Sequence, residues 1–215
     1  MIILLNQTDR KRLLITHSLL NSWDYLYKAS DEWYHSAYES FIQTLNRIET
    51  LPTVAMLNGR EFEKLVSAVV FDTQFADYSH KWIYGATEIA AIIKENCTLE
   101  QGKLYKEATV NNTDYLLYGV LDWIGCGVIY DVKFKENISN YSVGNYFDGT
   151  QHRMYFGLVE GVESFEYLIS NGKKVYRESY RREDCRPIEQ TISDFEKWLK
   201  CYNLWNIYVE KWTAK

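Results

Sequence analysis

The chain has 215 residues, of which 47% are hydrophobic and 25% charged, so it can bury a full core and is too apolar to be disordered. Its formal net charge of −5 argues against a surface that coats nucleic acid indiscriminately, but it is compatible with a local basic groove. No apolar run is long enough to cross a bilayer, and Met1–Asn6 lacks the basic start and apolar length of a secretion signal. We therefore expect one cytoplasmic domain over residues 1–215, with no membrane segment.

The first half of the chain has the residue spacing of helices. Apolar and aromatic residues recur at three- and four-residue intervals over 13–27 and 31–48, within an N-terminal helical region that we place at 13–50. A third helix is predicted to begin near Asn58, and a fourth is predicted over 85–95. These helices are expected to pack on a core formed by the second half.

From Lys103 onward the composition changes to that of strands. Segments 103–110, 115–124 and 127–135 are rich in Tyr, Val, Ile and Leu and are separated by turn residues, which predicts an antiparallel three-stranded meander.

A helix over 143–158 is predicted to follow the meander, and then a hairpin of 164–170 and 174–180 that turns at Asn171-Gly172. An amphipathic helix over 188–209, within a C-terminal helical region ending at 210, is expected to close the chain. This order of elements predicts an α/β (α+β) fold, with helices flanking a mixed central sheet that contains the meander.

The meander contains the residues that point to chemistry. Asp122 lies in the middle of the most apolar stretch, where a buried carboxylate without a partner would be costly. Asp131 and Lys133 are two residues apart on the next strand and therefore share a face. If the turn centres on Cys126-Gly127, opposed residue numbers sum to 253 and Asp122 faces Asp131. Two carboxylates that close repel each other unless a cation lies between them.

Simpler interpretations of these residues stay open at this point. A register shifted by one residue would put the acids on opposite faces, and Asp131 and Lys133 would then form a plain ion pair. Asn58 and Glu61 have the spacing of a capping box at the start of the third helix. Glu63 falls on the flank of the apolar face of that helix, where it is either a solvated side chain or a third acid of the same site.

Taken together, the motifs resemble a known family. Their order is Gly59-x-x-x-Glu63, Gly119-x-x-Asp122, Asp131-x-Lys133 and Gln151-x-x-x-Tyr155. It is similar to the PD-(D/E)XK nuclease superfamily, in the branch with lambda exonuclease, the RecB nuclease domain and CRISPR-associated exonucleases. Ile15-Thr16-His17-Ser18 also resembles the opening segment of the RecB branch. The family's eponymous proline is absent, because Leu121 precedes Asp122.

The resemblance implies a restriction-endonuclease-like core and a metal site. Glu63, Asp122, Asp131 and the Val132 carbonyl would bind Mg²⁺, with Mn²⁺ as a possible substitute, and Lys133 would act on the attacking water. Gln151, Tyr155 and Arg153 would support the site or contact DNA. Further basic residues in and after the hairpin are candidates for a phosphate track: Lys173, Lys174, Arg177, Arg181 and Arg182.

No iron–sulfur cluster is expected, because the four cysteines lack the spacing that holds one in some relatives: Cys97, Cys126, Cys185 and Cys201. Reduced structural thiols are the expected state of these residues.

The leading functional hypothesis is a metal-dependent DNA exonuclease of phage-type recombination or repair. Its candidate partners are DNA, a single-strand annealing protein and further copies of the chain. The alternatives are a structure-specific endonuclease of the same fold, a catalytically silent DNA-binding module and an all-helical interaction protein with the meander misassigned. A nuclease assay and a measurement of strand content separate these hypotheses.

Overall fold

The structure is a computed structural model that describes residues 11–74, 76–96 and 99–214. Its helices are α1 (His17–Lys28), α2 (Asp31–Leu45), α3 (Val54–Val70), α4 (Ile83–Asn96), α5 (Gln151–Leu158), α6 (Ile188–Cys201) and α7 (Trp205–Trp212), with a short 3-10 turn at Arg182–Asp184. Its strands are β1 (Leu13–Thr16), β2 (Leu99–Val110), β3 (Thr113–Gly125), β4 (Val128–Phe134), β5 (Ser164–Ser170) and β6 (Val175–Arg181).

The strands form one six-stranded mixed sheet in which β3 is the central element. One edge of β3 pairs with β2 along its length, antiparallel. The other edge is shared: β1 pairs with residues 115–118 in parallel, and β4 pairs with residues 123–125 in antiparallel orientation. β5 then pairs with β4 in parallel, and β6 pairs with β5 in antiparallel orientation.

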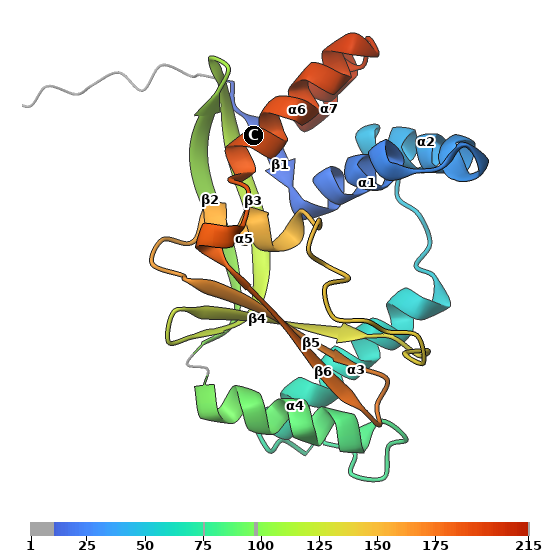
Figure 1. Cartoon of the computed structure of the whole chain (residues 1–215), viewed down its shortest axis with the longest axis vertical. Helices are drawn as coiled ribbons and strands as arrows, with labels where there is room; N and C mark the ends of the chain where they lie inside the picture. The colour runs from blue at the N-terminus through green and yellow to red at the C-terminus, as the bar shows by residue number, and fades with distance from the viewer. Residues whose placement is uncertain (1–10, 75, 97–98, 215) are drawn as a thin grey trace, which may run out of the picture.

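The predicted fold class is confirmed. The sheet is mixed, β2, β3 and β4 form the antiparallel meander, and helices flank it, consistent with a restriction-endonuclease-like fold. The all-helical alternative is wrong, because strands make up much of the second half of the chain. Figure 1 shows the long β2–β3 hairpin along the long axis, with β4, β5 and β6 crossing it.

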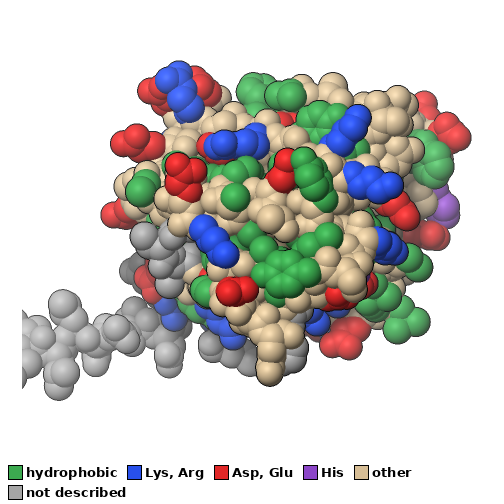
Figure 2. All heavy atoms as spheres, turned by 90° about the horizontal axis from the view of Figure 1, so that it is seen from below, with side chains coloured by type: hydrophobic (Ala, Val, Ile, Leu, Met, Phe, Trp, Pro, Cys, Tyr) green, Lys and Arg blue, Asp and Glu red, His purple; other side chains and the backbone are tan. Residues whose placement is uncertain are grey.

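Two hydrophobic clusters hold helices against the sheet. The larger one joins α1, α2, α5, α6 and α7 to β1, β3 and β5, through buried residues such as Leu19, Phe41, Tyr115 and Phe195. The smaller one joins α3 and α4 to β3, β4 and β5, through residues that include Phe62 and Trp82. In Figure 1, α3 and α4 lie together at the lower end, whereas α1, α2, α6 and α7 gather at the upper end. Figure 2, which looks onto the lower end, shows lysine and arginine side chains interspersed with acidic ones and no continuous basic surface.

The predicted start of the first helix at residue 13 is wrong. Leu13–Thr16 is the strand β1, and α1 begins at His17 after Thr16, whose hydroxyl accepts a hydrogen bond from the Leu19 amide at 3.2 Å. The partner of β1 is β3, about a hundred residues away, so no local pattern distinguishes this apolar run from a helix start.

The third helix also begins earlier than expected. α3 starts at Val54, and the Thr53 hydroxyl accepts a hydrogen bond from the Met56 amide at 3.2 Å. Asn58 and Glu61 lie inside this helix, so the predicted capping box is wrong, and Glu61 instead contacts His80. The predicted buried face is confirmed at Phe62, Leu65, Val66 and Val69.

The helix predicted over 143–158 is shorter, because α5 begins only at Gln151. The buried Glu178 of β6 accepts hydrogen bonds from the amides of Gly144, Asn145 and Tyr146 and from the hydroxyls of Tyr141 and Tyr180. Gly144 has a φ of +97°, which a helix does not allow. A carboxylate remote in sequence therefore fixes residues 141–146 as a loop.

The C-terminal helix predicted over 188–209 is two helices, α6 and α7. Asn203 adopts a left-handed φ of +59°, and the Leu204 amide donates back to the Leu199 carbonyl at 2.8 Å, which ends α6 with a C-capping motif. α7 then packs on the start of the chain, where the Tyr208 hydroxyl donates to the Leu14 carbonyl at 2.9 Å.

The hairpin prediction at Asn171-Gly172 is confirmed, with β5 and β6 on either side and a φ of +86° at Gly172. None of the described helices has the length and apolar character needed to span a membrane. Three cysteines are free thiols at separate places, namely Cys126, Cys185 and Cys201. Cys97 and the N-terminal Met1–Asn6 segment lie outside the described residues.

Candidate active site

The shared edge of β3 creates a gap in the sheet. Residues 119–122 lie between the stretch of β3 paired with β1 and the stretch paired with β4, and we call these four residues the strand fork. The Tyr155 hydroxyl of α5 donates to the Val120 carbonyl, so a helix side chain satisfies a backbone group that no strand reaches. The fork is thus a break in the sheet into which side chains enter.

The predicted register is confirmed at this point. Trp123 pairs with Tyr130 and Ile124 with Ile129, and both pairs sum to 253; the ladder ends at Trp123 and Tyr130, and the same register continued by one residue sets Asp122 opposite Asp131. Directly opposed residues of an antiparallel pair share a face, so Asp122, Asp131 and Lys133 lie on the same side of β3 and β4. The Oδ2 atom of Asp122 accepts a hydrogen bond from the Val132 amide at 3.2 Å.

Asp131 is the centre of this group. Its side chain is 7% exposed, and its Oδ2 atom lies 2.6 Å from the Lys133 Nζ atom. That contact is an ion pair without hydrogen-bond geometry, so Oδ2 is buried with no hydrogen bond of its own. The other oxygen, Oδ1, accepts a hydrogen bond from the Gln151 side-chain amide at the start of α5. Gln151 and Tyr155 therefore reach the fork from the same helix, one turn apart.

Burial and the neighbouring charges raise the pKa of two acids, Asp122 and Glu63. Burial, and then the negative charge of Asp131, raise the pKa of Asp122 to about 8, although Lys133 and the Val132 amide oppose the shift. Burial also raises the pKa of Glu63 on α3, with Lys133 lowering it and Asp131 raising it again. Burial disfavours the charge on Lys133, but Asp131 and Asp122 outweigh that effect and raise its pKa. Glu63 therefore interacts electrostatically with Lys133 and Asp131.

Glu63 makes no hydrogen bond or ion pair with Asp122, Asp131 or Lys133 among the interactions of the described residues. No group of three or more His, Cys, Asp or Glu side chains in residues 11–74, 76–96 and 99–214 is arranged to hold a metal ion as it stands. The positive charge that lies beside Asp131 is the ammonium group of Lys133. The donors nevertheless fit a hard divalent cation, because they are carboxylate oxygens, one of them buried without a hydrogen bond.

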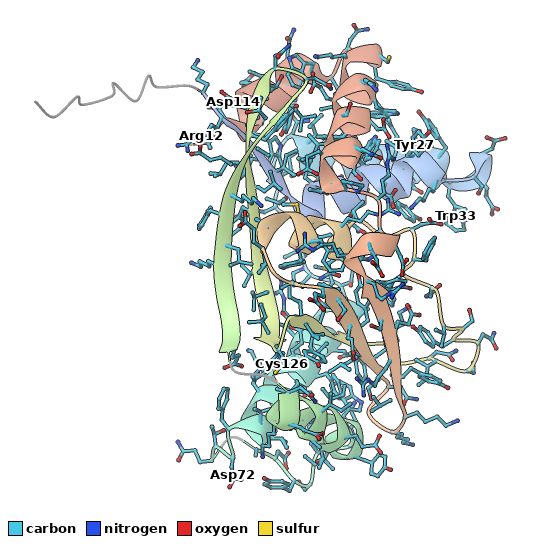
Figure 3. The ribbon with its side chains drawn as sticks, turned by 60° about the vertical axis from the view of Figure 1, so that its left-hand side comes forward. Arg12, Tyr27, Trp33, Asp72, Asp114 and Cys126 are labelled. Carbon is cyan, nitrogen blue, oxygen red and sulfur yellow. The ribbon has the colours of Figure 1, made fainter. Side chains whose placement is uncertain are left out.

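Glu63 also lines a pocket on the surface of α3. The pocket has a volume of about 620 Å³ and lies beside α3 and the start of β2. Its wall contains two basic residues, Arg60 and Lys64, and the exposed ring of Phe71, which packs on Trp123 at a centroid distance of 5.7 Å. Figure 3 labels Cys126, at the β3–β4 turn, and Asp72, the residue after Phe71, toward the same end of the molecule.

Two further side chains near the site, those of His17 and Tyr146, were not predicted to be site residues. His17, the first residue of α1, has its pKa lowered to about 3 by burial and by the charges of Lys133 and His152. Tyr146 of the Glu178-bound loop stacks on Tyr167 at 4.3 Å, and burial raises its pKa to about 12, with Lys133 opposing the shift and Asp131 adding to it. The Ile15-Thr16-His17-Ser18 resemblance was the signal available for His17; nothing local marked Tyr146.

Arg153 does not join the carboxylates. It lies on another side of α5, where its guanidinium reaches the Phe147 carbonyl at 3.5 Å and Asp148 at 3.9 Å. The three arginines in and after the hairpin are also engaged elsewhere: Arg177 pairs with Glu166, Arg181 pairs with Glu183 and Asp184, and Arg182 donates to three backbone carbonyls. These contacts favour a structural role for the hairpin arginines over a continuous phosphate track.

No known family profile matches the sequence, and no curated protein matches it significantly. Several solved structures share its fold, and two of them serve as examples. The crystal structure of SSO0001 has a TM-score of 0.51 at 11% identity, covering 91% of this chain and 79% of that one. The crystal structure of LHK-Exo in complex with dAMP has a TM-score of 0.51 at 13% identity, covering 87% of this chain and 88% of that one. At these identities the likeness is one of fold alone.

Proposed function

We propose that the chain is a metal-dependent DNA exonuclease that hydrolyses phosphodiester bonds at the strand fork. The observation that carries the proposal is the convergence of two acids and a lysine on one face of β3 and β4, with Gln151 of α5 bound to one of the acids. The shared fold with LHK-Exo, whose structure contains a deoxynucleotide, supports the choice of substrate class.

In this proposal Glu63, Asp122, Asp131 and the Val132 carbonyl would hold Mg²⁺, or Mn²⁺ in its place. A bound divalent ion would polarise the scissile phosphate, lower the pKa of a bound water and neutralise the acids. Glu63 and Asp122 would have to turn toward Asp131 to complete the site. The raised pKa of Asp122 indicates a cluster that a cation would stabilise.

Lys133 acts as a positive charge rather than as a base in this scheme. Asp131 and Asp122 raise its pKa, so its ammonium group stays protonated and donates hydrogen bonds to the attacking water and to a phosphate oxygen. Water attacks phosphorus and releases one proton to solvent, the P–O3′ bond breaks, and O3′ takes up a proton from solvent, so the products are a 5′-phosphate and a 3′-hydroxyl. Gln151 holds Asp131 in place, and Tyr155 keeps the fork open by binding the Val120 carbonyl.

In this proposal the pocket beside Glu63 would hold the DNA strand that enters the fork. Arg60 and Lys64 supply positive charge for backbone phosphates, and the exposed ring of Phe71 offers a surface on which a base can stack. Two acids, Glu63 and Glu100, line the same pocket, and Glu100 accepts a hydrogen bond from the Ser67 hydroxyl at 2.6 Å. The path is therefore of mixed charge, and its volume of about 620 Å³ suits one strand rather than a duplex.

The test is cleavage of linear and circular duplex DNA with Mg²⁺ or with EDTA, by the wild type and by Lys133→Ala. We expect cleavage of linear DNA only, none with EDTA, and a loss of at least roughly 100-fold in rate for Lys133→Ala. Lys103→Ala, which removes an exposed lysine of β2, is the matched control and should cleave at the wild-type rate.

Each other outcome has a defined meaning. Cleavage of circular DNA would show that the enzyme is an endonuclease, acting at the same site, and not an exonuclease. Full activity of Lys133→Ala, or full activity in EDTA, would refute the proposed site. No cleavage by the wild type under any condition would leave a DNA-binding module as the better description.

A further inference from the structure

A second lysine follows Lys133 at the end of β4. Residues two apart on a strand point to the same side, so Lys135 continues the row that Asp131 and Lys133 begin. Lys135 comes directly after Phe134, the last residue of β4, and its amide donates to the Ser170 carbonyl of β5 at 2.9 Å. The pairing with β5 therefore continues through this residue. In Figure 1 the connection to α5 leaves this end of β4.

The ammonium group of Lys135 is placed by aromatic rings and not by an acid. It lies 4.7 Å from the ring centroid of Tyr146 and 5.2 Å from that of Tyr141. In the part of the chain that the structure describes, it makes no ion pair and no hydrogen bond. Burial lowers the pKa of Lys135, and Glu178 opposes this shift from beyond ion-pair distance. The oxygens of Glu178 already accept five hydrogen bonds, so its charge is used by the loop.

The two rings belong to a segment that the fold fixes in place. Glu178 binds the loop over 141–146 through three backbone amides and through the Tyr141 hydroxyl. The Tyr146 ring also stacks on the buried ring of Tyr167, with centroids 4.3 Å apart. A cation–π contact holds an ammonium group without using its N–H donors on an acceptor. The donors of Lys135 are therefore positioned but free for a ligand.

Lys133 and Lys135 are accessible and act on one another. The side chain of Lys133 is 30% exposed and Lys135 is half-buried. The charge of Lys133 disfavours the charge of Lys135, and it also acts on the Tyr146 hydroxyl, so the ring that contacts Lys135 lies near Lys133 as well. An anion beside both lysines would relieve this repulsion. Two residues of a strand span about 7 Å, which is comparable to the separation of consecutive phosphates in a DNA strand.

We propose that Lys135 binds the phosphate next to the scissile one and that the Tyr146 ring positions its ammonium group. The inference rests on the proposed function, because it takes the strand held at Lys133 as its reference. Lys133 acts on the phosphate that is cut, whereas Lys135 contacts one that stays intact. A contact of that kind fixes the position of the strand and is equally strong before and during the reaction.

Steady-state cleavage of a short linear duplex with Mg²⁺ tests the contact. Lys135→Gln should raise KM roughly tenfold and leave kcat unchanged, as for the loss of one charge-assisted hydrogen bond that is uniform along the reaction. Lys135→Arg keeps the charge and should keep KM near the wild-type value. Lys103→Gln, which changes an exposed lysine of β2, is the matched control and should leave both constants unchanged.

A double-mutant cycle tests the positioning role of Tyr146. Tyr146→Phe keeps the ring and should keep the wild-type KM, whereas Tyr146→Leu removes the cation–π contact and should raise KM by roughly two- to fivefold. In a Lys135→Gln background, Tyr146→Leu should raise KM no further, because the group that the ring positions is already gone. A general loss of packing would instead give additive effects, and that result would overturn the positioning role.

Binding of the same duplex in EDTA separates this inference from the proposed function. If the wild type binds DNA but cleaves it under no condition, the proposed function fails. A Kd roughly tenfold higher for Lys135→Gln, with a salt slope lower by about 1, would then still support the Lys135 contact.

Three results would overturn the Lys135 contact. One is wild-type KM and Kd for Lys135→Gln while Lys133→Ala is inactive, which would leave the catalytic site standing. Another is a lower kcat for Lys135→Gln at unchanged KM, because Lys135 would then act on the chemistry. The third is a wild type that neither binds nor cleaves DNA, which would refute both proposals.

Discussion

At the scale of single residues, one hydrogen bond explains how Asp122 is held at the fork. The carboxylate accepts from the Val132 amide, so a side chain of β3 replaces the backbone partner that the ladder would otherwise supply. The spacing of Asp122 and Asp131 around the turn was sufficient to predict that they share a face, because the register follows from the turn. The bond to Val132 was not predictable, because it depends on where the two strands diverge.

Asp122 makes stability depend on pH. Its pKa is raised to about 8 in the folded chain, whereas an unfolded aspartate titrates near about 3.9. Between these values the folded state binds more protons than the unfolded state, so the contribution to stability is present at low pH and is lost as pH rises toward 8. The positive charge of Lys133 and the partial exposure of the carboxyl groups make this pH dependence smaller.

Asp122→Asn removes this titration while keeping an oxygen for the Val132 amide. Without divalent ions we expect the variant to have a higher Tm than the wild type. The gain in Tm should be small at pH 5 and about 4 °C at pH 8, which corresponds to about 1 to 2 kcal/mol in the free energy of unfolding. Thermal melts at the two pH values measure it. An equal gain at both would contradict the proposed titration.

At the scale of elements, the local signals predicted the strands better than the helix ends. The Asn171-Gly172 turn and the turn at Cys126-Gly127 fixed the hairpin and the meander, because Gly172, Cys126 and Gly127 take the positive φ that such turns need. The loop over 141–146 was missed because Glu178, which binds its backbone, belongs to a strand more than thirty residues later. The break at Asn203 had a local signal, since asparagine is the second choice after glycine for the left-handed helix end.

The contact between α4 and the β5–β6 turn leads to a stability prediction. A Cβ at Gly85 would lie 2.3 Å from the Ser170 hydroxyl and 2.8 Å from the backbone of Gly172, whose carbonyl accepts from the Gly85 amide. Gly85→Ala should therefore lower the free energy of unfolding by about 1 to 3 kcal/mol, as overpacking does. Denaturant unfolding measures the change.

Gly59→Ala is the matched control in α3. A Cβ there meets nothing within 4 Å, and a helix interior favours alanine, so this variant should gain about 0.5 to 1 kcal/mol. Destabilisation by both substitutions would show that the contact with Gly172 is not the cause.

At the scale of the whole molecule, the charge balance limits how DNA can be held. With a net charge of −5 and ion-paired arginines on the hairpin, few cations are available for phosphates. In EDTA we expect the logarithm of the DNA-binding constant to fall only gently with the logarithm of the salt concentration. The double variant Arg60→Gln/Lys64→Gln should reduce that slope by about 2, or about one for each cation removed. Lys94→Gln, an exposed lysine of α4, serves as the control. An unchanged slope in the double variant would place the DNA elsewhere.

Sharing one edge of β3 between two strands also has a consequence for how the chain reaches its native state. β4 follows β3 after a two-residue turn, so this pairing closes a short loop, whereas β1 must return across about a hundred residues. Local pairs form sooner than distant ones, so the acids meet in an early hairpin, before the opening around them exists. We expect the opening that would admit a substrate to be completed only when β1 pairs with β3, so a half-folded chain would carry the charges of the site without its shape.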